Sequence, residues 1–74
     1  MTEVRNHSEK NRFEITVDGE VAGYTEYRSG PGVRAFVHTV VEERFEGKGL
    51  AAELVAYALE ATRADGLLVE PHCP

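Results

Sequence analysis

Apolar and polar residues alternate strictly over residues 12–17, where Phe, Ile and Val are separated by charged or hydroxyl side chains. A period of two residues is typical of a strand with one buried face. The Asp18-Gly19 pair that follows suits the positive backbone angles of a tight hairpin turn. A second strand, rich in Val, Thr and Tyr, is predicted over residues 20–28. Within it, Gly23 indicates a bulge or a close approach of two backbones.

The most apolar stretch of the chain, residues 33–41, follows the turn signal SGPG at residues 29–32. Strict alternation would turn Val33, Ala35, Val37, Thr39 and Val41 to one side and Arg34, Phe36, His38 and Val40 to the other. Because apolar residues occur on both sides, the pattern predicts a central strand that is covered on both faces.

A helix is predicted over residues 49–65, because apolar residues recur there at steps of three and four. Gly66 is well placed to end it. A short strand is expected over residues 67–70, with Pro71 stopping its hydrogen-bonded ladder. Strand, helix and strand in this order form a right-handed crossover, so the third and fourth strands should be parallel. The polar residues 1–12 predict no element.

These elements predict an α+β fold of the α/β type, a single domain over residues 1–74 with a mixed sheet of about four strands and one main helix. The formal charge of −5 argues against nucleic-acid binding, which needs a concentrated basic face. No segment reaches the roughly 20 apolar residues of a membrane span. With one cysteine, no internal disulfide and no signal-peptide pattern, we expect a soluble cytoplasmic protein.

The stretch RFEGKGLA at residues 44–51 places two glycines at the start of the predicted helix. The first N–H groups of a helix have no partner within it and, together with the helix dipole, attract anions such as phosphate. Gly47 and Gly49 would leave those groups accessible, and Arg44 and Lys48 add positive charge. The alternative is that both glycines serve only as turn residues. The loop lacks the Walker pattern and the three-glycine dinucleotide fingerprint.

Arg44-x-x-Gly47-x-Gly49, followed by Leu50 and Ala51, resembles the acetyl-CoA pyrophosphate loop of the GNAT acyltransferases. The similarity to small single-domain members of this family extends to Phe13-Glu14-Ile15, Asp18-Gly19, Gly23, Glu26-Tyr27, His38-Thr39 and Pro71-x-Cys73-Pro74. It runs from about Arg12 to the last residue. In that family the chain continues past the cysteine into a further helix, so the resemblance implies a GNAT-like domain that is truncated at its C-terminus.

The resemblance implies transfer of an acetyl group from acetyl-CoA to an amine that the sequence does not identify. Backbone N–H groups between Glu46 and Ala51 would bind the pyrophosphate, and N–H groups near Val40 and Val41 would polarise the thioester carbonyl. The expected cofactor-binding residues are Thr39, Val40, Val41, Arg44, Glu46, Gly47, Lys48, Gly49, Leu50 and Ala51.

His38 and Cys73 are the candidate catalytic residues. An unperturbed histidine titrates near neutral pH and can act as a general base; alternatively His38 is satisfied by a neighbour in a small core. Cys73 is expected beside the thiol end of coenzyme A, where it would accept the acetyl group or form a mixed disulfide, or else it is an inert buried residue. Thr39 is expected to pack or to bond nearby groups. The scattered histidines do not predict a metal site.

Two other functions remain open at this stage. The chain could be a coenzyme A-binding module without catalysis, or a fragment that a partner completes. Without the family's terminal helix, one sheet face would be apolar and poorly covered. We therefore expect either self-association through that face or marginal thermal stability.

Overall fold

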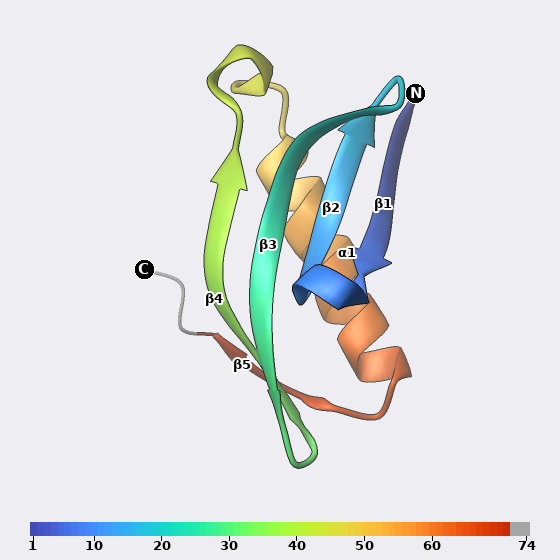
Figure 1. Ribbon diagram of the computed structural model, residues 1–74, viewed down its shortest axis with the longest axis vertical. Helices are drawn as coiled ribbons and strands as arrows, with labels where there is room; N and C mark the ends of the chain where they lie inside the picture. Colours follow the sequence, from blue (N-terminus) through green and yellow to red (C-terminus); the bar gives the residue numbers. More distant parts are fainter. Residues whose placement is uncertain (72–74) are drawn as a thin grey trace.

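The computed structural model describes residues 1–71, which form one curled sheet with a helix packed against it (Figure 1). The elements are β1 (Thr2–His7), the 3₁₀ turn η1 (Ser8–Lys10), β2 (Arg12–Val17), β3 (Glu20–Gly30), β4 (Val33–Val41), the 3₁₀ turn η2 (Glu43–Phe45), α1 (Leu50–Ala64) and β5 (Leu68–Pro71). The α+β fold with one main helix is confirmed.

The five strands lie in the order β1-β2-β3-β4-β5, antiparallel except for the parallel pair β4 and β5. The crossover through α1 therefore joins parallel strands, as predicted. The β2–β3 hairpin turns at Asp18 and Gly19, both with positive φ. Strand β5 starts at Leu68, one residue later than predicted, and Pro71 belongs to it and pairs with Phe36 rather than stopping its ladder.

The residue pattern did not predict β1, whose six residues include only one apolar side chain, Val4. This edge strand pairs along its whole length with β2. Val4 packs against the core, and the Tyr27 hydroxyl donates a hydrogen bond to Asn6 Oδ1 at 2.7 Å. The strand is therefore held by its neighbours, and its own residue pattern does not reveal it.

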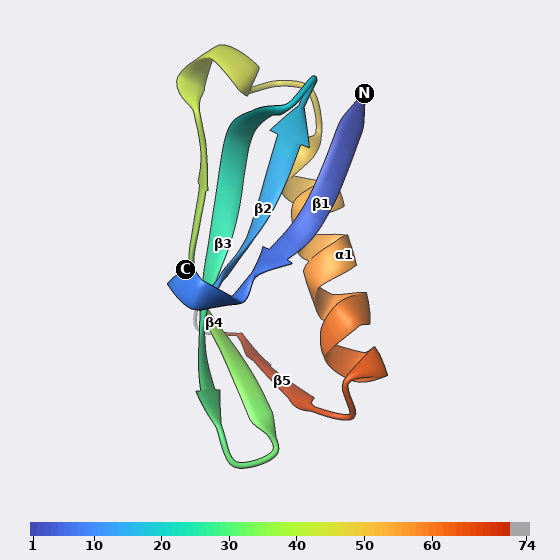
Figure 2. The ribbon, with the colours of Figure 1, turned by 45° about the vertical axis from the view of Figure 1, so that its right-hand side comes forward.

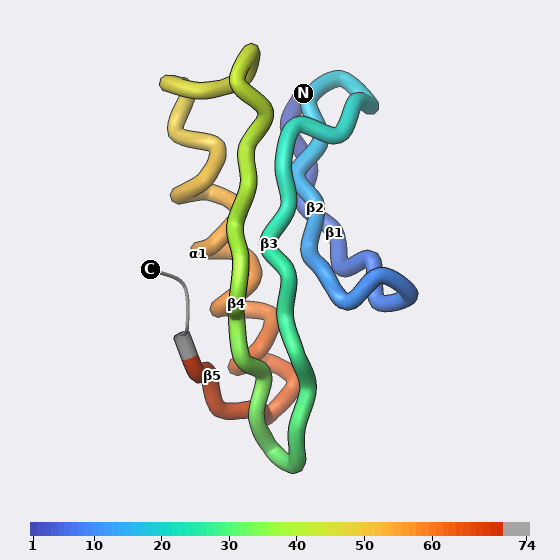
Figure 3. Tube along the Cα trace, turned by 60° about the vertical axis from the view of Figure 1, so that its left-hand side comes forward, coloured from blue at the N-terminus to red at the C-terminus, as the bar shows by residue number. Residues whose placement is uncertain are grey.

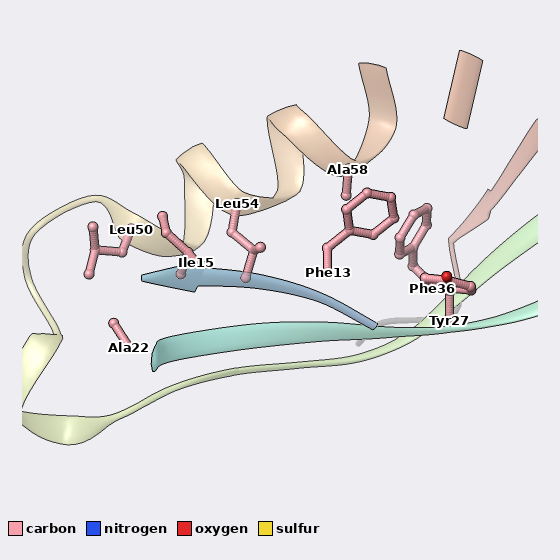
Figure 4. Packing of buried hydrophobic residues seen from close by; sticks show 8 residues of the cluster. All are labelled: Phe13, Ile15, Ala22, Tyr27, Phe36, Leu50, Leu54 and Ala58. Atoms are coloured by element: carbon pink, nitrogen blue, oxygen red, sulfur yellow. The ribbon is translucent and has the colours of Figure 1, made fainter. Parts of the chain in front are cut away.

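Helix α1 covers one face of the sheet (Figure 2). Its buried side chains recur every four residues and form a single stripe: Leu50, Leu54, Ala58 and Thr62. Figure 4 shows the first three of these side chains facing Phe13, Ile15, Tyr27 and Phe36 of the sheet. Gly49 and Asp65 flank the helix, and Gly66 follows with a φ of 75°, so the predicted boundaries are confirmed to within one residue.

The predicted faces of β4 are wrong because the strand contains a bulge. Tyr27 pairs with Phe36 and Glu26 with His38, which leaves Val37 as an extra residue on β4. Arg34 and Phe36 are buried, whereas His38 is exposed. In the part of the chain that the structure describes, α1 covers one face of β4 only, so the expected second cover is not seen.

The face opposite α1, called the open face below, carries mainly polar side chains on β1, β2 and β3. Its members are Glu3, Arg5, His7, Arg12, Glu14, Thr16, Val21, Tyr24, Glu26 and Arg28, with Ala35, His38 and Val40 from β4. The expectation of an apolar surface there is wrong for these strands, because their outward positions alternate with the core positions. Self-association stays an untested prediction.

Candidate functional site

Two glycines shape the loop that leads from η2 into α1. Gly47 has a φ of 79° and Gly49, the residue before the helix, a φ of 73°. Residues that carry a side chain rarely adopt this left-handed backbone conformation, so the loop requires glycine at both positions. The first helical hydrogen bond runs from the Glu53 N–H to the Gly49 carbonyl at 3.2 Å. The N–H groups of the three preceding helical residues therefore have no acceptor within the helix.

A groove of about 280 Å³ lies between this loop and the end of β4. It is lined by Thr39, Val41, Phe45, Glu46, Gly47, Gly49, Leu50 and Ala51. Seven of these eight residues belong to the expected cofactor set, and the structure brings them together although ten positions separate Thr39 from Gly49. Val40, Arg44 and Lys48 do not line the groove.

The two basic residues of the loop differ in their surroundings. Arg44 forms ion pairs with Glu20 and, at 3.3 Å, with Glu42, and its guanidinium lies 4.7 Å from the centre of the Phe45 ring. Within residues 1–71, Lys48 forms no ion pair or hydrogen bond. The charge of Arg44 is thus balanced by carboxylates, while that of Lys48 remains available to an anion in the loop.

The described pairing of β4 with β5 runs from Val33 with Leu68 to Phe36 with Pro71, the last described residue. Beyond Phe36, the edge of β4 that faces away from β3 continues to Val41, beside the first turns of α1 (Figure 3). An apolar cavity of about 260 Å³ adjoins this edge, between α1 and the sheet. It is lined by Thr25, Phe36, Thr39, Val55, Ala58, Leu59 and Val69.

Thr39 lines both the groove and the cavity. Its hydroxyl shares a hydrogen bond of 2.9 Å with that of Thr25. On the neighbouring residue, the Val40 carbonyl points toward β3, because its oxygen would lie 2.6 Å from a Cβ added at Gly23. Backbone groups alternate sides along a strand, so the Val41 N–H is directed away from β3, toward the other edge of β4.

His38 lies on the open face, and its ring centre is 6.4 Å from that of Tyr24. It is exposed, which excludes the alternative of a histidine satisfied within the core. The other candidate catalytic residue, Cys73, lies outside the described residues. The expected proximity of Cys73 to the site therefore stays a prediction.

Sequence reasoning missed a buried carboxylate on the open face. Glu14 is only 2% exposed, and Arg12 donates hydrogen-bonded contacts of 2.9 and 2.8 Å to it. His7 Nδ1 and Arg5 lie 3.1 and 3.4 Å from the same carboxylate. Burial raises the pKa of Glu14. The contacts with Arg12 and His7 lower this pKa by more than burial raises it, so the net pKa is below its ordinary value. Arg12 lies on the same strand as Glu14, whereas only the pairing with β1 brings His7 and Arg5 to it.

Two other kinds of site are absent from residues 1–71. No helix there is long and apolar enough to cross a membrane. No group of three or more His, Cys, Asp or Glu side chains in that range is placed to hold a metal ion.

Comparison with known proteins shows the family of this chain. The model of the GCN5-related N-acetyltransferase family matches residues 12–74. A search among curated proteins finds no match. Among solved structures, the fold is similar to that of the ribosomal-protein-alanine N-acetyltransferase from Brucella melitensis biovar Abortus 2308, with a TM-score of 0.76 and 18% sequence identity. This similarity covers 85% of the present chain and 50% of the other, so the chain spans half the length of that protein. Because the family model covers most of its length, the chain belongs to the GCN5-related N-acetyltransferases.

Proposed function

We propose that this domain binds acetyl-CoA and transfers the acetyl group to an amine. The observation that carries the proposal is the pair of hollows beside β4, a groove at the glycine loop and an apolar cavity under α1, both lined by Thr39. A long, narrow molecule with a phosphate at one end and an apolar arm at the other suits this pair.

The start of α1 would hold the pyrophosphate of coenzyme A. The N–H groups of Leu50 and Ala51 carry the positive end of the helix dipole, and both residues line the groove. Lys48 would add a cation in the same loop. Arg44 can contribute only by giving up Glu20 and Glu42, its present partners. A phosphate would compensate for that exchange, because it attracts a guanidinium more strongly than an exposed carboxylate does.

The edge of β4 would hold the reactive end. Bound acetyl-CoA supplies an activated thioester, and the polypeptide has to stabilise the charge that develops on its carbonyl oxygen. The Val41 N–H points away from β3 and is the donor that we assign to this oxygen. The Val40 N–H lies on the β3 side with its carbonyl, so Val40 would contribute packing and strand geometry rather than a hydrogen bond.

His38 would act as the general base. It removes one proton from the ammonium form of the acceptor and releases it to solvent. The neutral nitrogen then forms the new N–C bond while the C–S bond breaks, and the second proton lost by the nitrogen neutralises the departing thiolate. Since His38 is exposed on the open face, the amine would approach from that side of the β4 edge.

The substitution Gly49→Ala tests the loop, with Gly66→Ala as its matched control. The two glycines flank α1, have φ values of 73° and 75°, and offer open space to an added Cβ. Both variants therefore carry a similar backbone strain of about 1–2 kcal/mol. Only the methyl group at position 49 would enter the groove. We expect Gly49→Ala to weaken coenzyme A binding at least tenfold, about 1.4 kcal/mol, and Gly66→Ala to leave it unchanged.

Isothermal titration calorimetry with coenzyme A gives the affinities, and a thiol-release assay with acetyl-CoA and Nα-acetyl-lysine methylamide measures transfer. Binding without release would support the alternative of a coenzyme A-binding module. Absence of binding in the folded wild-type chain would refute the proposal and favour a fragment that a partner completes. The cytoplasmic location inferred from the sequence stays a prediction.

A further inference from the structure

Four side chains on the open face form a row across β1, β2, β3 and β4. His7 pairs with Arg12, Arg12 with Glu26, and Glu26 with His38. Side chains directly opposite one another on neighbouring antiparallel strands have Cβ atoms about 4.5–5.5 Å apart. The carboxylate of Glu26 thus stands beside the imidazole of His38, on the face from which the acceptor would approach.

Glu26 differs from the other carboxylate in the middle of this face. Glu14 is surrounded by Arg12, His7 and Arg5, all within 3.4 Å. Within residues 1–71, Glu26 forms no ion pair or hydrogen bond, although it is half-buried. Glu26 is therefore a half-buried carboxylate whose negative charge is not neutralised by a direct ion pair.

Neither of the neighbouring cations forms an ion pair with Glu26. Arg12, its partner on β2, donates to Glu14 and places its guanidinium 4.4 Å from the centre of the Tyr24 ring. Arg28, two residues along β3 on the same face, is exposed and forms no ion pair with Glu26. Glu26 and His38 share this part of the open face with the Tyr24 ring, whose centre is 6.4 Å from that of His38.

We propose that Glu26 is the residue that binds the acceptor and that the acceptor is a primary alkylamine in its ammonium form. This inference rests on the proposed acetyl transfer. The Glu26 carboxylate accepts a hydrogen bond from the ammonium group and holds its nitrogen beside His38, which takes the proton. Amines that are neutral at pH 7 gain nothing from this charge, so Glu26 selects for cationic acceptors.

The test compares Glu26→Gln with Glu3→Gln. Both substitutions remove one carboxylate from the open face without changing side-chain size, and Glu3 lies on the distant edge strand β1. Binding of Nα-acetyl-lysine methylamide is followed by NMR shifts of His38 in the presence of coenzyme A. We expect Glu26→Gln to weaken this binding at least tenfold and Glu3→Gln to change it less than twofold.

Turnover is measured in parallel with the lysine derivative and with p-toluidine, an arylamine that is neutral at pH 7. Glu26→Gln should raise KM for the lysine derivative at least tenfold and leave KM for acetyl-CoA and for p-toluidine unchanged. Turnover that is insensitive to Glu26→Gln refutes the inference but leaves acetyl transfer standing. Glu26-dependent binding without turnover supports the acceptor site and refutes transfer. Wild-type protein that shows neither binding nor turnover of the lysine derivative overturns the inference.

Discussion

Gly23 is the position where a single added methyl group should be most disruptive. A Cβ at this residue would lie 2.6 Å from the Val40 carbonyl oxygen and 3.1 Å from both Cα and Cγ2 of Val41. Favourable contacts between non-bonded atoms lie at about 3.5–4.0 Å. Two of these three atoms, the Val40 oxygen and the Val41 Cα, are backbone atoms, so no side-chain rotation relieves the contact. In Gly23→Ala, β3 and β4 have to separate.

The expected cost combines two opposing effects. Overpacking of this kind destabilises a protein by about 1–3 kcal/mol. Replacing glycine by alanine also restricts the unfolded chain, which returns about 0.4–1 kcal/mol. We therefore expect Gly23→Ala to lower the free energy of unfolding by roughly 1–2 kcal/mol. For a domain of this size that corresponds to a fall in melting temperature of about 5–15 °C.

Urea denaturation followed by far-UV circular dichroism measures this change, and Gly30→Ala is the matched control. Gly30 ends the same strand, has no positive φ, and would place its Cβ 3.2 Å from Val33 Cγ1, an atom of a side chain that can adjust. Gly30→Ala should therefore be neutral or slightly stabilising. If Gly23→Ala proves as stable as Gly30→Ala, the close approach of β3 and β4 at this point is wrong.

The remaining predictions concern a titrating group and a thiol. The pKa of Glu14 is lowered in the folded protein by Arg12 and His7, from an ordinary value of 4.5. A lowered pKa stabilises the folded state above the unfolded value, and this contribution disappears as the pH falls through the folded value. The urea midpoint of the wild type should thus exceed that of Glu14→Gln at pH 6, and the gap should close toward pH 3; a constant gap would contradict this. For Cys73, we expect that incubation with oxidised coenzyme A attaches one coenzyme A to the protein, as intact-mass spectrometry would show. Reduction should remove this adduct, and Cys73→Ala should not form it. If the wild type binds coenzyme A but forms no adduct, Cys73 does not lie at the thiol end of the site.

Local periodicity was sufficient for most of the fold. The alternation in residues 12–17 and the four-residue steps of α1 each specify an element without help from the rest of the chain, because a strand or a helix with one buried face repeats its apolar residues at a fixed period. The glycine loop was also recognisable, since a positive φ at Gly47 and Gly49 is a requirement of the local backbone.

Three features depended on contacts between segments that are distant in the sequence. Strand β1 is held by pairing with β2, and its own residues carry no period. The bulge at Val37 reverses the faces of β4 beyond Phe36, because register is decided between strands and a single extra residue turns each later side chain to the other side. This reversal places His38 on the open face.

The charges of the candidate site illustrate the same division. The sequence shows which residues are ionisable, and it placed Arg44 and Lys48 at the loop. Only the tertiary structure decides which charges are neutralised: Arg44 is engaged by carboxylates, while Glu26 has no such partner in residues 1–71. Coulomb attraction depends on distance in space, and the strand pairing that fixes those distances joins residues far apart in the chain.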